Sequence, residues 1–176
     1  MNTTSLRAIS LGADDDGGRR PSAWRTVLGA GAAAATLDLI YACGLYYLLR
    51  GAMPDRVLHT IASGIYGQEA YTGGLATAAV GFVAHYVILV VAAWWFFLAS
   101  RNLRVLRERA VACGLLYGFA IYCTMNFLVV PLSNSPLAKH AYELTLSLAR
   151  ASDIGMHLIF GLIIAFATRS YWRRAQ

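Results

Sequence analysis

Charged residues are scarce in this sequence: only 14% of its 176 residues are Asp, Glu, Lys or Arg, whereas 58% are hydrophobic. The mean hydropathy is +0.53. Because an ordinary soluble domain carries about a quarter charged residues, this composition excludes such a domain and indicates an integral membrane protein. The net charge of +6 does not indicate nucleic-acid binding, since no soluble segment combines basic residues with interleaved aromatics.

Several motifs of enzymes and metal sites are also missing. The sequence contains no Gly-rich phosphate loop, no nucleophile elbow and no His-Glu-x-x-His metalloprotease motif. Its three cysteines, Cys43, Cys113 and Cys123, lie in apolar runs and lack the paired spacing of a zinc or redox site. We therefore predict no disulfide, assign the cysteines to the packed interior, and assign no enzyme class.

Long apolar runs make up most of the chain. The run from Thr77 to Ala99 contains no Asp, Glu, Lys or Arg and is long enough to cross a bilayer core. The four predicted spans cover residues 26–49, 76–99, 110–132 and 151–169. They predict an all-α fold, an integral membrane four-helix bundle in up-down-up-down order. This single domain covers residues 25–172, between a disordered tail at 1–24 and a short tail at 173–176.

The two longer loops carry amphipathic patterns. In the first loop, Pro54 suits the start of a helix. Apolar residues then follow at helical spacing, namely Val57, Leu58, Ile61, Ala62 and Ile65. We predict a short helix that lies on the membrane surface or caps the bundle, with His59 in water on its polar face. A second amphipathic helix is expected after Pro136 and leads into the fourth span, and His140 there is also expected to be solvated.

Basic residues flank the spans unequally. Eleven of the fifteen Lys and Arg residues lie in the N-terminal tail, the middle loop and the C-terminal tail, and four lie in the other two loops. The positive-inside rule places the more basic side in the cytoplasm. We therefore predict both termini in the cytoplasm of a bacterium and both longer loops outside the inner membrane. The aromatic run 94–97 and the terminal Tyr171 and Trp172 are expected to be anchors at the inner interface.

Each span carries a polar side chain within its apolar run: Asp38, His85, Asn126 and His157. At about 1.5 Å of rise per residue, Asp38 lies near mid-membrane and the others lie at mid-depth or in the outer half. We predict a ligand or proton site there. In a square bundle His85 and His157 would face each other across the core, with the other two on the second diagonal. Because a carboxylate at this depth is costly, Asp38 either carries a proton or pairs with a histidine.

Helical spacing adds supporting residues to this cluster. Asp153 lies four residues before His157 and can accept a hydrogen bond from its ring, which would fix the tautomer. Tyr122 lies four residues before Asn126. The alternative is purely structural, because membrane His and Asn side chains often serve only as hydrogen-bond partners between helices. Both interpretations stay open at this stage.

Small residues follow one face of the first span. Gly31, Ala34, Ala35, Asp38 and Ala42 recur at helical spacing. Such a face lets another helix approach closely. We therefore predict that Asp38 points into the bundle and that this face permits a homo-oligomer, with the lipid bilayer as the other partner.

Three segments occur in a recognisable order: a span with His85, then GLLYGFAIYCTMNFLVVPL, then DIGMHLIFGLIIAF followed by an Arg-rich tail. In this order they resemble the YagU-like group of uncharacterised bacterial four-span inner-membrane proteins. In that group histidines stand at positions matching His85 and His157, and a third stands five residues before the proline of span three, where this chain has Asn126. The resemblance implies fold and location and implies no activity.

Three functions fit these patterns. The first is binding or passing a small solute, an ion or a proton at the polar cluster, because of Asp38. The second is a redox protein with haem b held between His85 and His157. Gly81 and Gly161 would then clear space for the macrocycle. Its variant is a single metal ion bound by the two histidines and Asp38. The third is an accessory or scaffold subunit, in which the polar residues serve only helix association.

Overall fold

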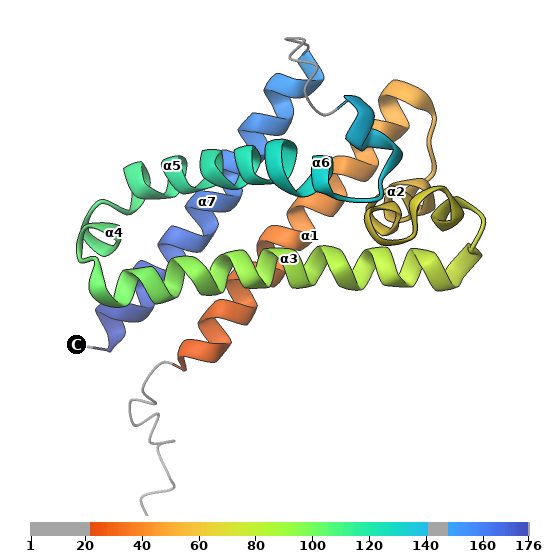
Figure 1. Ribbon diagram of the computed structural model, residues 1–176. Helices are drawn as coiled ribbons and strands as arrows, with labels where there is room; N and C mark the ends of the chain where they lie inside the picture. Colours follow the sequence, from red (N-terminus) through yellow and green to blue (C-terminus); the bar gives the residue numbers. More distant parts are fainter. Residues whose placement is uncertain (1–21, 141–147, 176) are drawn as a thin grey trace, which may run out of the picture.

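The computed structural model describes residues 22–140 and 148–175 (Figure 1). Its α-helices are α1 (Ala23–Arg50), α2 (Pro54–Tyr66), α3 (Gly74–Asn102), α4 (Val105–Glu108), α5 (Ala110–Thr124), α6 (Val130–Leu132) and α7 (Leu148–Arg174). Two turns of 3-10 helix, η1 (Gly67–Tyr71) and η3 (Pro136–His140), and a π-helix, η2 (Met125–Val129), complete the elements. The predicted tail and the rest of the second amphipathic helix lie largely outside these residues.

Within the described residues, four helical segments are long and apolar enough to cross a membrane: α1, α3, the continuous segment Ala110–Leu132, and α7. The chain is therefore a multi-pass membrane protein, and the predicted all-α four-helix bundle is confirmed. α1 begins after Ser22, whose Oγ accepts a hydrogen bond from the Arg25 amide. It ends at Gly51, where a φ of 62° requires the left-handed conformation that glycine adopts without strain.

The spanning helices form two crossing layers. α3 and α5 lie in front in Figure 1, and α1 and α7 run diagonally behind them. α5 packs along α7, while α1 packs against both α3 and α7, and α2 lies across one end of α3. The start of α1 and the end of α7 lie at one end of the bundle, here called the termini end. The opposite end, with α2 and η3, is called the α2 end.

Glycines let α5 and α7 touch through their backbones. A Cβ on Gly161 would lie 2.0 Å from the carbonyl oxygen of Gly114. A Cβ on Gly118 would lie 2.2 Å from the carbonyl oxygen of His157. Gly114 and Gly118 have the Gly-x-x-x-Gly spacing that allows such close crossings in membranes. The contact leaves no space for a larger residue at these positions.

The small-residue face of α1 is occupied within the chain. Ala34 and Ala35 are fully buried. A Cβ on Gly31 would lie 2.6 Å from Cα of Val90 in α3. The predicted close approach therefore takes place within the chain, between α1 and the next spanning helix, α3. The homo-oligomer stays a prediction, and it would have to use another surface.

The apolar core is concentrated at the termini end. Its buried side chains come from all four spanning segments: Val27, Ala30, Ala93, Phe96, Phe97, Ala110, Ile164 and Ala165. Trp94 and Trp95, by contrast, are 46% and 61% exposed. The predicted aromatic anchor therefore divides into two groups. The indoles face outward and the following two Phe rings fill the core, because successive residues on a helix point in different directions.

α2 buries a histidine that the sequence pattern placed in water. His59 is only 7% exposed, and its Nδ1 lies 3.1 Å from Oγ1 of Thr77 in α3. The prediction of a solvated His59 is therefore wrong. α2 sits so close to α3 that a Cβ on Gly81 would lie 2.0 Å from the carbonyl oxygen of Leu58. The close packing buries His59 and Ser63 of the polar face, while Arg56 on that face stays exposed. The side chain of His140 lies outside the described residues.

Candidate functional site

Asp38 of α1 pairs with His85 of α3. Oδ2 of Asp38 lies 3.5 Å from Nε2 of His85, and the two side chains are 21% and 8% exposed. The same nitrogen lies 3.0 Å from the carbonyl oxygen of Ala35. Because a backbone carbonyl only accepts hydrogen bonds, Nε2 of His85 carries the hydrogen. The histidine therefore donates toward both oxygens of α1.

A second pair lies on α7. Nδ1 of His157 lies 2.9 Å from the carbonyl oxygen of Asp153 and 3.3 Å from its Oδ1. This nitrogen carries the hydrogen for the same reason, so Nε2 is the basic nitrogen of the neutral ring. The ring packs edge-on against Tyr122, with centroids 5.4 Å apart, and lies 5.2 Å from the ring of Phe160. The Asp153 carboxylate is thus next to Nδ1 of the His157 ring, as the four-residue spacing predicts.

Asp38 links the two pairs. Its carboxylate interacts electrostatically with His157 and Asp153 as well as with His85. α1 contacts both α3 and α7, so a side chain on α1 can reach both. The rings of His85 and His157 make no contact with each other in the part of the chain described here. The arrangement is therefore centred on the carboxylate rather than on two opposed histidines.

Asn126 lies in the π-helical turn η2. Its Nδ2 donates to the carbonyl oxygen of Tyr122 at 3.1 Å. Among the described residues its side chain makes no hydrogen bond to either His–Asp pair. Asn126 therefore makes its hydrogen bond within its own helical segment. Tyr122 is the residue that connects this segment to His157. π-turns are frequent at functional sites, and this one precedes Pro131, which lacks a backbone N–H.

Two hydroxyl pairs that sequence reasoning missed flank Asp38. Oγ1 of Thr36 lies 2.9 Å from the hydroxyl of Tyr86 in α3. The hydroxyl of Tyr41 donates to Oγ of Ser152 in α7 at 2.6 Å. Thr36 lies two residues before Asp38 and joins α1 to α3, and Tyr41 lies three residues after Asp38 and joins α1 to α7. Their only sequence signal is proximity to Asp38, since the partners lie on distant segments.

A lateral cavity of about 250 Å³ opens between α5 and α7. Its lining consists of Phe119, Tyr122, Cys123, Phe127, Arg150, Ala151 and Ile154. Asp38, His85 and His157 do not line it. The cavity therefore meets the polar cluster only at Tyr122, and most of its wall is apolar.

The space required by the cofactor hypotheses is filled. Within residues 22–140 and 148–175, no three His, Cys, Asp or Glu side chains are grouped so as to hold a metal ion. His85, His157 and Asp38 therefore do not form the predicted three-ligand site. The space beside Gly81 and Gly161 is taken by the backbones of α2 and α5 rather than left for a macrocycle. The chemistry that the site offers is that of two linked histidine–carboxylate pairs.

Comparisons with protein-family models, with curated proteins and with solved structures give no match for this chain. The resemblance to the YagU-like group therefore stays a prediction.

Proposed function

We propose that this chain is a bacterial inner-membrane protein, with both termini in the cytoplasm, that takes up and releases a proton at its two linked histidine–carboxylate pairs. The observation that carries the proposal is the position of Asp38, which pairs with His85 and interacts with His157 and Asp153. A carboxylate at membrane depth is costly and typically marks a proton or ion site. The resemblance of three segments to the YagU-like group favours the same location.

A proton fits this site better than a small solute does. The lateral cavity does not reach Asp38 or His85, whereas a proton needs no chamber. Imidazole is the side chain that gains and loses a proton near neutral pH. Carboxylates and imidazoles in electrostatic contact are the groups from which membrane proton sites are built.

The proton enters from the α2 end. Asp153 is the most exposed of the four side chains, at 38%, compared with 21% for Asp38, 12% for His157 and 8% for His85. Asp153 lies near the α2 end, and the apolar core that contains Phe96 closes the termini end. We therefore expect proton binding from one side without conduction through the bundle.

Infrared difference spectroscopy of the protein in lipid tests this proposal. A step from neutral to acidic pH should produce the C=O band of a protonated carboxylic acid, and Asp38→Asn should remove most of it. Asp55→Asn is the matched control, because Asp55 is an exposed carboxylate in the first turn of α2. An unchanged band in Asp38→Asn would contradict the assignment.

A second measurement separates binding from passage. Liposomes containing the protein and an internal pH indicator should acidify no faster than empty liposomes when a pH gradient is imposed. Rapid acidification that Asp38→Asn abolishes would replace one-sided binding with proton conduction.

A further inference from the structure

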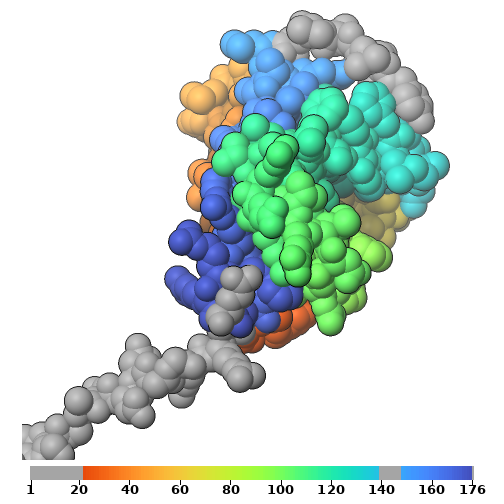
Figure 2. All heavy atoms as spheres, turned by 90° about the vertical axis from the view of Figure 1, so that its left-hand side faces the viewer, coloured from red at the N-terminus to blue at the C-terminus, as the bar shows by residue number. Residues whose placement is uncertain are grey.

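An open hollow of about 420 Å³ lies at the termini end, away from the proton site. It is lined by Arg107 and Glu108 of α4 and by Arg169, Trp172 and Arg173 of α7. Figure 2 views the molecule from this side, where the dark blue end of α7 lies close to the green segment that contains α4. Three guanidinium groups against one carboxylate give the hollow an excess of positive charge.

Arg107 and Trp172 form a fixed wall of this hollow. Arg107 donates from Nε to the carbonyl oxygen of Ser100 and from Nη2 to that of Arg101, each at 2.5 Å. Its guanidinium carbon lies 3.9 Å from the centroid of the Trp172 ring, and Nε1 of Trp172 donates to Oγ of Ser100 at 2.9 Å. These bonds use only part of the five N–H donors that a guanidinium carries. The wall is therefore rigid and still positively charged.

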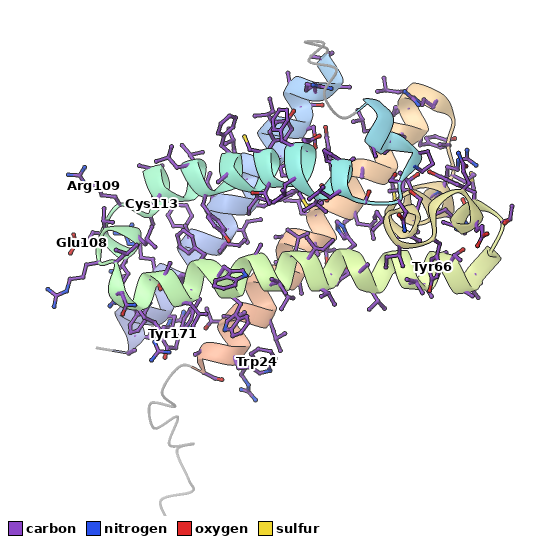
Figure 3. All side chains as sticks on the ribbon, viewed as in Figure 1. Trp24, Tyr66, Glu108, Arg109, Cys113 and Tyr171 are labelled. Atoms are coloured by element: carbon purple, nitrogen blue, oxygen red, sulfur yellow. The ribbon has the colours of Figure 1, made fainter. Side chains whose placement is uncertain are left out.

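Arg169 and Arg173 line the hollow and have no partner among the described residues. They lie four residues apart on α7, which places them on the same side of the helix. Across the described ranges neither side chain makes an ion pair or hydrogen bond, and Glu108 pairs with neither of them. Glu108 projects outward from α4 in Figure 3. Their charges are thus available to an anion from outside the chain.

We propose that this hollow binds the phosphate of an anionic phospholipid headgroup, with Arg169 and Arg173 as its ligands. The hollow lies at the end of a helix that is long and apolar enough to cross a membrane, and the ends of such helices reach the headgroup region of a bilayer. Basic pockets between the ends of spanning helices bind such headgroups, and Trp residues are enriched at the same level. The proposal is independent of the proton site, because it uses α4 and the last turns of α7.

Native mass spectrometry of the protein in neutral detergent tests this proposal. The probes are dioleoyl phosphatidylglycerol, dioleoyl phosphatidylcholine and inorganic phosphate. We expect tight binding of phosphatidylglycerol alone. The R169Q/R173Q variant should weaken that binding on the order of 30-fold, because each basic contact contributes about fivefold.

Charge-matched variants separate a site from general attraction. R104Q/R109Q removes as many charges from the same end but outside the hollow, and it should change phosphatidylglycerol binding by less than about threefold. R169K/R173K keeps the charge and should retain most of the binding. Circular dichroism checks that each variant is folded. If R169Q/R173Q unfolds, R169Q alone replaces it, with an expected loss of phosphatidylglycerol affinity of about fivefold.

Three results would overturn the assignment. Equal affinity for phosphatidylcholine would show that no anion is selected. Equal losses in R169Q/R173Q and R104Q/R109Q would show attraction to the whole face rather than to this hollow. Full displacement of phosphatidylglycerol by inorganic phosphate at the same concentration would reassign the site to a soluble anion.

Discussion

The two ends of the bundle are held together by different interactions. At the termini end, rings pack on rings, as with Phe96 on Tyr117 at 4.9 Å and Phe97 on Trp172 at 5.9 Å between centroids. Toward the α2 end, histidine–carboxylate and hydroxyl pairs connect the helices. In a membrane interior, apolar packing is the less costly choice. The polar half is therefore where we expect function, and the aromatic half is where we expect stability.

This contrast makes opposite predictions for the two halves. Changes at the termini end should lower the free energy of unfolding and leave proton uptake intact. Changes at Asp38 should remove most of the carboxylic-acid infrared band and leave the free energy of unfolding nearly unchanged. The scaffold alternative predicts instead that Asp38 affects stability alone.

The largest loss of stability is expected from Gly161→Ala, at the crossing that joins the halves. The new Cβ would meet the carbonyl oxygen of Gly114 at 2.0 Å, and backbone atoms cannot rotate away as a side chain can. We expect a loss of about 3 kcal/mol, measured by circular dichroism during titration with dodecyl sulfate. Gly155→Ala on the same helix is the control, because nothing lies within 4 Å of its new Cβ. Similar losses in the two variants would refute the backbone contact.

A smaller loss is expected from Ser100→Ala at the termini end. Ser100 is fully buried, and its Oγ accepts from Nε1 of Trp172 and donates to the carbonyl oxygen of Phe97 at 2.6 Å. The substitution leaves the Trp172 N–H without this partner, at a cost of about 1–3 kcal/mol. The same unfolding titration measures it, and exposed Ser170→Ala serves as the control. The infrared band of the carboxylic acid should not change, and its loss would break the division between the halves.

The smallest loss of stability is expected from Asp38→Asn. The amide oxygen can still accept from Nε2 of His85, so we expect a change within about 1 kcal/mol. The C=O band of the protonated carboxylic acid should nevertheless be mostly lost, since an amide does not titrate. A loss as large as that of Gly161→Ala, with the infrared band retained in the folded fraction, would favour the scaffold alternative.

Features that depend on local spacing could be predicted from the sequence. The four spans follow from runs without charge, and Asp153 stands behind His157 because residues four apart share a helix face. The carboxylate of Asp38 was expected to carry a proton or to find a histidine partner, because its burial alone is costly. Each of these inferences depends only on the residue pattern within a single helix.

Features that depend on how two helices rotate against each other could not be predicted. α3 is apolar on all sides, so no stripe indicates which face meets α1, and the choice of His85 as the partner of Asp38 stayed open. Gly81 and Gly161 fit the haem hypothesis in the sequence, because a glycine does not show whether a cofactor or a neighbouring backbone occupies the space beside it. His59 was placed in water because the pattern of α2 does not show how deeply it lies against α3.

The glycine crossing of α5 and α7 also has a mechanical consequence. A contact made by backbone atoms fixes the two helices at one point and leaves their far ends joined only by softer side chains, so it acts as a fulcrum. Asn126 lies eight residues beyond Gly118, a lever arm of about 12 Å. A tilt of about 10° around that fulcrum displaces the η2 segment by about 2 Å. The lateral cavity and Tyr122 lie along this arm, so slight tilting of α5 changes the contact between Tyr122 and His157, and it moves Ala110, eight residues on the other side of Gly118, by a similar distance.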